Sequence, residues 1–366
     1  METPMIGRMS GRAVVLLLVP LLAGCSIGDV RREPPTASPR ATVTAPPPSA
    51  AVAEVRRVRV AVAQRYAPPY VEFVDAEHGY ALFANCGEPP PGDDCPARLF
   101  ATDDGGRSWR EVPHPHPAAE NHQLYAAPGV LTLWSEPHGW WTSTDGGTSF
   151  THALDGPPPQ WVGAQSRVQL IEDSGQVGEW DGQRLRPLAA QPRVPGLNTV
   201  DAGDGPLVVA AGEKDGKPYA AVSFDRGRSW QQTPVPAPDG RVGVLRAVVE
   251  RDGTAWLVGE RPDRNSFPAL WRLRRGWDPI SADGHPPHIQ SVAPIGGGLL
   301  AVTGPGGAGA VGDGHYTTLL WPIGPERSLS VLADGTIVAV GGDGGILLGV
   351  GRVAERRWTK IILDNS

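Results

Sequence analysis

The sequence predicts an all-β protein: a seven-bladed β-propeller of four-stranded antiparallel blades, preceded by a signal peptide and a disordered tether. Three observations predict this fold class. An eight-residue pattern recurs at multiples of about 40 residues, which is a period typical of propeller blades. The 366 residues include 47 glycines and 39 prolines, which suits short strands and tight turns. No stretch shows the apolar period of a helix over three turns.

The repeated pattern reads hydroxyl-x-Asp-x-Gly-x-Ser-aromatic and occurs as TDDGGRSW, STDGGTSF and SFDRGRSW. One interval of about 40 residues is followed by one of about 80, so the three copies are in phase. A single octapeptide is weak evidence, whereas three in phase indicate repeated structural units. The positions that define the pattern are Thr102, Asp104, Gly106, Ser108, Trp109, Ser143, Asp145, Gly147, Ser149, Phe150, Ser223, Asp225, Gly227, Ser229 and Trp230.

Each octapeptide is predicted to close a tight turn between two strands of one blade. The Asp carboxylate and the first hydroxyl can accept backbone N–H groups there, and the glycine supplies a positive φ. The aromatic residue then begins the next strand and covers the apolar space between sheets. A calcium site is disfavoured, because no unit supplies the dense run of oxygen ligands that a calcium loop needs.

Seven units of about 40 residues cover the chain from residue 66 onward. Each contains about four short β-type runs separated by Gly, Asp, Asn or Pro, and none could bury its apolar faces alone. Residues 55–63, VRRVRVAVA, either pair on the outer edge of the last blade or lead into the first. The unit boundaries are 66–113, 118–154, 158–192, 197–236, 241–282, 286–323 and 326–364.

The octapeptides resemble the Asp-box, or BNR repeat, of sialidase-like β-propellers. The first unit, VEFVDAEHGYALF followed by LFATDDGGRSWREV, looks like the repeat of seven-bladed photosystem-assembly-factor-like propellers and of many bacterial lipoproteins. Units four to seven depart from that pattern. The resemblance therefore implies the architecture of residues 66–364 and says little about partners.

Residues 1–24 are interpreted as a lipoprotein signal peptide. Arg8 and Arg12 precede the apolar run AVVLLLVPLLAG, which is short for a membrane span. The run ends in LLAGC, which resembles the bacterial lipobox, although an ordinary signal peptide with a chance cysteine is the alternative. Residues 25–55 are rich in Pro, Ala, Ser and Thr and are expected to form a disordered tether. The propeller is expected over 56–366.

This leader predicts a lipid-anchored protein on the extracytoplasmic face of the cell membrane, with the bilayer as partner through acylated Cys25. Cys86 and Cys95 bracket GEPPPGDD and are expected to form a disulfide in an oxidising compartment. A zinc site is disfavoured because two thiols lack the further ligands that zinc requires. A net charge of −6 gives no electrostatic reason to bind nucleic acid.

Binding residues are expected on the loops at the end of the blades opposite the octapeptides, because loops on a rigid scaffold carry function. His114 and His116, with His285 and His288, are candidates for a metal site. Prolines flank both histidine pairs and favour exposed loops instead, so neither a metal nor another cofactor is assigned. The longest loops on this face are 84–97, 113–122, 259–268 and 281–289.

The function expected is that of a monomeric, non-catalytic module that binds a protein or a cell-envelope glycan. The alternative is a sialidase-like glycoside hydrolase. Sialidases of this fold use an arginine triad, a Tyr–Glu pair and an acidic Asp, and carry an Arg-Ile-Pro or Arg-Leu-Pro motif before the first box. The near match here, Arg193-Val194-Pro195, follows two boxes, and no catalytic residue is assigned. The adjacent Trp140 and Trp141 should point to opposite faces of a strand, leaving one of them more exposed.

Overall fold

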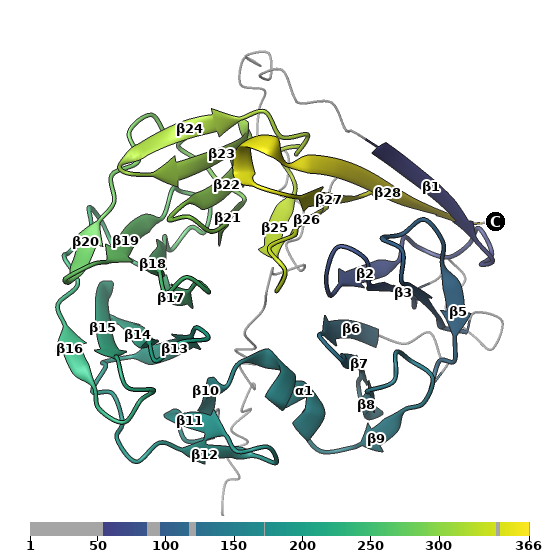
Figure 1. Cartoon of the computed structure of the whole chain (residues 1–366), viewed down its shortest axis with the longest axis horizontal. Helices are drawn as coiled ribbons and strands as arrows, with labels where there is room; N and C mark the ends of the chain where they lie inside the picture. The colour runs from purple at the N-terminus through teal and green to yellow at the C-terminus, as the bar shows by residue number, and fades with distance from the viewer. Residues whose placement is uncertain (1–53, 86–95, 117–121, 172, 342–344, 366) are drawn as a thin grey trace, which may run out of the picture.

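Seven β-sheets surround a common centre in the order of the sequence (Figure 1). The computed structural model describes residues 54–85, 96–116, 122–171, 173–341 and 345–365. Within these ranges five sheets have four strands, one has three and one has five. The predicted seven-bladed propeller is therefore confirmed. No helix of the described segments has the length and apolarity that crossing a bilayer would require.

Blades are numbered 1 to 7 in chain order, and within each blade successive strands are antiparallel neighbours. The strands of blades 1 to 4 are β2 Tyr70–Phe73, β3 Gly79–Phe83, β4 Arg98–Thr102, β5 Arg110–Val112; β6 His122–Ala127, β7 Val130–Ser135, β8 Gly139–Ser143, β9 Thr151–Ala153; β10 Val168–Ile171, β11 Gln176–Trp180, β12 Leu185–Pro187; and β13 Leu197–Ala202, β14 Val208–Lys214, β15 Lys217–Ser223, β16 Gln231–Thr233. Those of blades 5 to 7 are β17 Val244–Val249, β18 Ala255–Glu260, β19 Ala269–Leu273, β20 Trp277–Pro279; β21 Ser291–Pro294, β22 Leu300–Gly304, β23 Gly307–Gly312, β24 His315–Leu319; and β25 Ser328–Val331, β26 Ile337–Val340, β27 Ile346–Val350, β28 Arg357–Asn365. A 3₁₀ turn, η1 Val353–Glu355, precedes β28.

Blade 3 departs from the expected four strands because helix α1, Pro159–Gln165, stands where the other blades have their innermost strand. The helix lies on the side of blade 3 nearest the centre of the ring and contacts β6 and β7 of blade 2 (Figure 1). Pro159 in its first turn lacks the N–H that a helix start would leave unpaired anyway. The Gln169 side chain donates to the Val162 and Ser166 carbonyls, which pairs backbone oxygens at the other end.

The ring is closed by the N-terminal strand β1, Glu54–Val60, which adds to blade 7 as a fifth strand. It runs parallel to β28, from Glu54 opposite Thr359 to Val60 opposite Asn365. Of the two alternatives for residues 55–63, pairing on the outer edge of the last blade is therefore the observed one. Arg56 reaches the Gly105 carbonyl in blade 1, which links β1 to the next blade.

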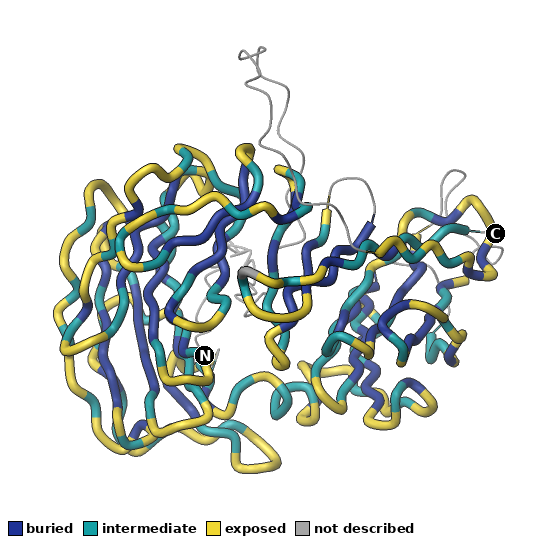
Figure 2. The backbone as a smooth tube through the Cα atoms, turned by 45° about the horizontal axis from the view of Figure 1, so that its top comes forward, coloured by how far each residue is buried: buried dark blue, intermediate teal, exposed yellow. Residues whose placement is uncertain are grey.

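The apolar core consists of buried clusters between neighbouring blades, while the turns at both ends are exposed (Figure 2). Between blades 1 and 2, for example, Leu82 and Leu99 pack with Leu124, Leu131 and Leu133. The clusters found among the described residues fill six junctions: 1–2, 3–4, 4–5, 5–6, 6–7 and 7–1. The junction between blades 2 and 3 has no such cluster in that part of the chain.

Candidate functional site

The three octapeptides form the same hydrogen-bonded corner between the third and fourth strands of blades 1, 2 and 4. In blade 2, Ser143 Oγ donates to Asp145 Oδ1 (2.7 Å) and accepts from the Gly147 N–H (2.8 Å). Asp145 also accepts from the Ser149 N–H (2.9 Å) and hydroxyl (2.6 Å). The same pairs recur around Asp104 and Asp225. These carboxylates are therefore occupied in holding a backbone turn.

Hydrogen bonds also fix the charge of these carboxylates. The Ser229 hydroxyl, followed by the Ser229 N–H and the Ser223 hydroxyl, lowers the pKa of Asp225 to about 2. The Asp145 carboxyl, in the same setting, has a lowered pKa from the equivalent Ser149 and Ser143 contacts. An ionised carboxylate that accepts several hydrogen bonds is favoured over its protonated form. Each corner is consequently charged at neutral pH.

Each octapeptide corner also covers the junction with the preceding blade. A β-carbon on Gly147 would lie 3.2 Å from Cγ2 of Val112 in blade 1, and Gly227 similarly approaches Leu188 in blade 3. Both glycines have positive φ, which a side chain would strain. The following aromatics Phe150 and Trp230 pack partly buried against those same junctions. The octapeptides thus have a structural role, in turn closure and in sealing a junction.

On the opposite end of the blades, five histidines and a tryptophan stack at the junction of blades 1 and 2. His114 stacks on His122 with ring centroids 4.9 Å apart, and His116 stacks on Trp141 at 5.2 Å. His138 lies 4.4 Å from His116, and His152 covers the other side of Trp141 at 4.7 Å. Burial, followed by the charges of His122 and His116, lowers the pKa of His114 to about 3. This is a packed column of rings.

The two histidine pairs considered for one metal site lie in different junctions. His285 belongs to the loop between blades 5 and 6, where its ring stacks 3.9 Å from Phe267. His114 and His116 pack between blades 1 and 2 instead. Among the described residues no group of three or more His, Cys, Asp and Glu has the arrangement of a metal site. The participation of His122, His138 and His152 follows from the fold and had no signal in the sequence.

The junction between blades 2 and 3 is lined by aromatic rings. Because side chains alternate across a strand, β7 directs Leu133 toward blade 1 and Trp134 toward blade 3. Trp140 of β8 pairs with Trp134 at 5.9 Å between ring centroids, and Tyr125 of β6 stacks on Trp140 at 6.0 Å. Trp161 of α1 approaches Tyr125 at 5.4 Å. These four rings, which we call the aromatic row, are all partly exposed.

The two adjacent tryptophans therefore do point to opposite faces. Trp141 is 9% exposed and packs toward blade 1, whereas Trp140 is partly exposed toward blade 3.

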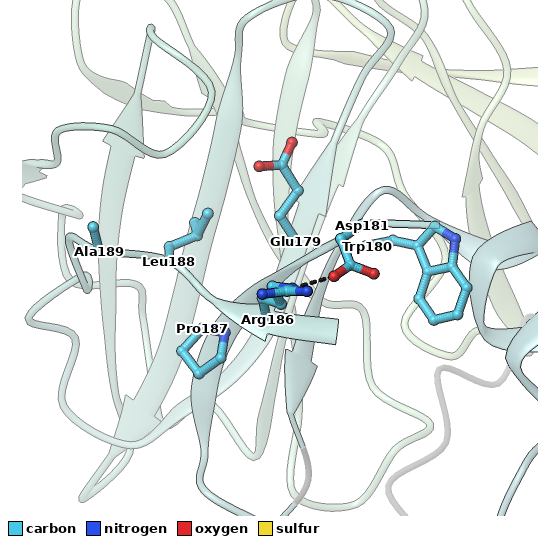
Figure 3. A pocket seen from close by; sticks show the side chains of 7 residues that line it. All are labelled: Glu179, Trp180, Asp181, Arg186, Pro187, Leu188 and Ala189. Atoms are coloured by element: carbon cyan, nitrogen blue, oxygen red, sulfur yellow. Dashed lines mark hydrogen bonds and ion pairs between the residues drawn. The ribbon is translucent and has the colours of Figure 1, made fainter. Parts of the chain in front are cut away.

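An open depression of about 430 Å³ lies on the outer strands of blade 3, and Trp180 lines it (Figure 3). Arg186 forms an ion pair with Asp181 in the same depression. Trp180 also packs against α1, where a β-carbon on Gly163 would lie 2.6 Å from the indole nitrogen. The depression and the helix that carries Trp161 therefore adjoin one another. The other residues that line the depression are Glu179, Pro187, Leu188 and Ala189.

A sialidase site needs several arginines that converge on one substrate carboxylate, so the settings of three arginines are informative. Arg193 is exposed on the loop between blades 3 and 4. Arg327 is buried and donates to the Ala339 and Gly345 carbonyls. Arg246 is paired with Glu260 at 2.9 Å. One of these arginines is therefore on an exposed loop and the other two already have protein partners, which is not the arrangement of arginines that bind one substrate carboxylate.

Two carboxyl groups on innermost strands have raised pKa values. Burial raises the pKa of Glu72 in β2 to about 7. Burial also raises that of Asp201 in β13 to about 6, against hydrogen bonds from the Val249 and Ala202 N–H groups. Asp201 accepts from Val249 N at 2.7 Å, so it joins blade 4 to blade 5. The two carboxyls belong to separate blades, 1 and 4.

The cysteine assignments lie outside the described residues. Cys25 falls in residues 1–53 and the expected Cys86–Cys95 disulfide falls in residues 86–95. The lipid attachment and the disulfide therefore stay predictions.

No protein-family model and no curated protein matches the sequence. Solved structures with a similar fold include YCF48 from Cyanidioschyzon merolae, with 13% identity over 79% of this chain and 98% of that chain and a TM-score of 0.48. A YCF48 bound to D1 peptide has 15% identity over 83% of this chain and 87% of that chain, with a TM-score of 0.34. The GH74 xyloglucanase from Xanthomonas campestris has 19% identity over 79% of this chain and 46% of that chain, with a TM-score of 0.31. At such identities these are similarities of fold.

Proposed function

We propose that this chain is a non-catalytic binding or assembly module of the Asp-box class, anchored by lipid to the extracytoplasmic face of a membrane. Its partner is a protein or a cell-envelope glycan. The observation that carries the binding role is the aromatic row, which gathers four partly exposed rings at a junction without a buried apolar cluster among the described residues. Binding sites are commonly lined by aromatic side chains with few polar groups.

The Asp-box assignment is supported by the shared chemistry of the three corners. Each uses a hydroxyl, a carboxylate and a glycine in the same hydrogen-bond pattern. The anchoring role rests on the leader sequence ending in LLAGC and on the polar tether that follows it. Replacement of Cys25 by Ala should release the chain from the membrane fraction, and metabolic labelling with palmitate should disappear with it.

The binding role is tested with a signal-deleted chain carrying Cys25→Ala as bait for detergent-solubilised cell envelope. We expect a defined envelope component to be retained, and Trp134→Ala together with Trp140→Ala to abolish its retention. Phe224→Ala is the matched control, because Phe224 is an aromatic residue that is 60% exposed outside the aromatic row. Equal retention by all three proteins would refute a role for the row, and turnover of a fluorogenic glycoside panel would replace the binding role with a hydrolase.

A further inference from the structure

The aromatic row differs from the packing at every other described junction. There, buried apolar side chains of two blades meet, as Val168 and Val177 of blade 3 meet Val200 and Val208 of blade 4. On the other side of blade 3 stands α1, a helix with no buried residue. A short helix in the place of a strand does not extend the flat face of blade 3. The facing side of blade 2 is therefore left partly uncovered.

The row combines flat apolar surfaces with an uncharged polar group. The Tyr125 hydroxyl donates to Gln123 Oε1, which fixes the orientation of the amide beside the ring. Gln123 lies opposite Trp134 in the sheet, so its amide edges the tryptophan pair. Within the described part of the chain the amide NH₂ of Gln123 donates to no other group, and it can donate two hydrogen bonds.

This chemistry selects one kind of ligand. We propose that the aromatic row binds a neutral glycan chain at the junction of blades 2 and 3, which specifies the partner class of the binding module proposed above and rests on that proposal. A pyranose ring presents a flat face of C–H groups to an aromatic ring, while its hydroxyls accept from an amide at the edge. The row residues carry no charge at neutral pH, so they offer nothing to balance an acidic sugar.

An apolar protein segment is the competing occupant, and the row fits it less well. Apolar segments are held by pockets that enclose aliphatic side chains, with burial comparable to a protein interior. Here the four rings are successive neighbours from Trp134 to Trp140, Tyr125 and Trp161, with centroid spacings of 5.9, 6.0 and 5.4 Å. A set of partly exposed neighbouring rings can contact more than one sugar unit of a glycan chain.

The inference is tested by titrating the signal-deleted chain carrying Cys25→Ala with four tetrasaccharides: cellotetraose, maltotetraose, tetra-N-acetylchitotetraose and tetragalacturonic acid. Tryptophan fluorescence and calorimetry report binding. We expect at least one neutral tetrasaccharide to bind and to shift the fluorescence, and the acidic one to bind at least tenfold more weakly. Trp161→Ala should reduce affinity at least tenfold without unfolding the blade, because its helix has no buried residue.

Two further variants sharpen the test. Tyr125→Phe keeps the ring but removes the hydroxyl that orients Gln123, and should weaken binding a few-fold. Phe224→Ala should bind as the parent chain does, and thermal melts confirm that each variant is folded. Unchanged affinity in Trp161→Ala and Trp140→Ala overturns the assignment, as does failure of every neutral tetrasaccharide to bind at millimolar concentration. Retention of an envelope protein with no saccharide binding refutes the glycan while leaving the binding module intact.

Discussion

Blade 2 meets its two neighbours in opposite ways. Toward blade 1, Leu124, Leu131 and Leu133 are buried to within a few per cent, and an octapeptide corner covers the contact. Toward blade 3, Trp134 and Trp140 of the same sheet stay partly exposed beside a short helix. The difference shows that one strand can stabilise the ring with one row of side chains and offer a binding surface with the other.

The largest effect separating the two faces should come from neighbouring residues of β7. Leu133→Ala should lower the free energy of unfolding by about 2–5 kcal/mol, because it leaves a cavity in a closed core. Trp134→Ala should lower the free energy of unfolding by at most about half as much as Leu133→Ala does, because the tryptophan side chain is already partly in contact with water. Urea denaturation of both variants makes the comparison. Equal losses would show that the junction of blades 2 and 3 is as closed as its neighbour.

The second effect is a pH dependence of the folding free energy that arises at the junction of blades 1 and 2, which we call the closed junction. The pKa of His114 is lowered to about 3 in the folded chain, so the unfolded chain binds the extra proton below its ordinary value of 6.5. Its contribution to stability is therefore present above pH 6.5 and is lost as the pH falls toward 3. Between pH 7.5 and pH 5 this amounts to about 2 kcal/mol.

The raised pKa of Glu72 acts in the opposite direction over that range, so the variant is compared with the parent chain. His114→Asn keeps an acceptor for the His116 N–H and removes the titration. The parent chain should gain about 2 kcal/mol more than the variant on going from pH 5 to pH 7.5. Parallel pH profiles from urea denaturation would contradict a buried neutral His114. The pKa values of Asp104 and Asp225 are lowered to about 2 and that of Asp145 is also lowered, so these carboxyls stay ionised throughout the range from pH 5 to pH 7.5.

The smallest effect concerns the corners. Ser143→Ala removes the acceptor of the Gly147 N–H in the corner over the closed junction, and should cost about 1–2 kcal/mol. The corresponding turn of blade 3 has no octapeptide, and Asp181 there accepts from the Gln183 and Arg184 N–H groups in an exposed setting. Asp181→Asn should change the melting temperature by less than Ser143→Ala does. If Asp181→Asn lowered the melting temperature more than Ser143→Ala, the stability at the junction of blades 2 and 3 would depend more strongly on its turn than that at the junction of blades 1 and 2.

The sequence was sufficient for the features that rest on local chemistry. Hydroxyl, carboxylate and glycine at fixed spacing specify a corner wherever they occur, so Asp104, Asp145 and Asp225 marked equivalent turns and hence the blade period. Alternation likewise separated Trp140 from Trp141. Neither inference required knowledge of which blades become neighbours.

Features that depend on distant contacts could not be predicted. Helix α1 spans seven residues, too few for an apolar period, and it contacts blade 2 as well as Trp180 of blade 3. Alternation along β7 would by itself predict that Trp134 is a core residue. It is partly exposed because the neighbouring element is this helix, so the aromatic row could not be predicted without the helix. His138 and His152 join His116 and Trp141 only after the strands of blade 2 are aligned.

The parallel pairing of β1 has a mechanical consequence. The proposed lipid anchor precedes β1, so a pull from the membrane along the strand acts on its first residue, Glu54. Seven paired positions against β28 would then resist sliding together, rather than opening one after another. The ion pair between Arg57 and Asp364 lies within this stretch. A pulling force transmitted through the tether would therefore load the β1–β28 pair in shear at the outer edge of blade 7.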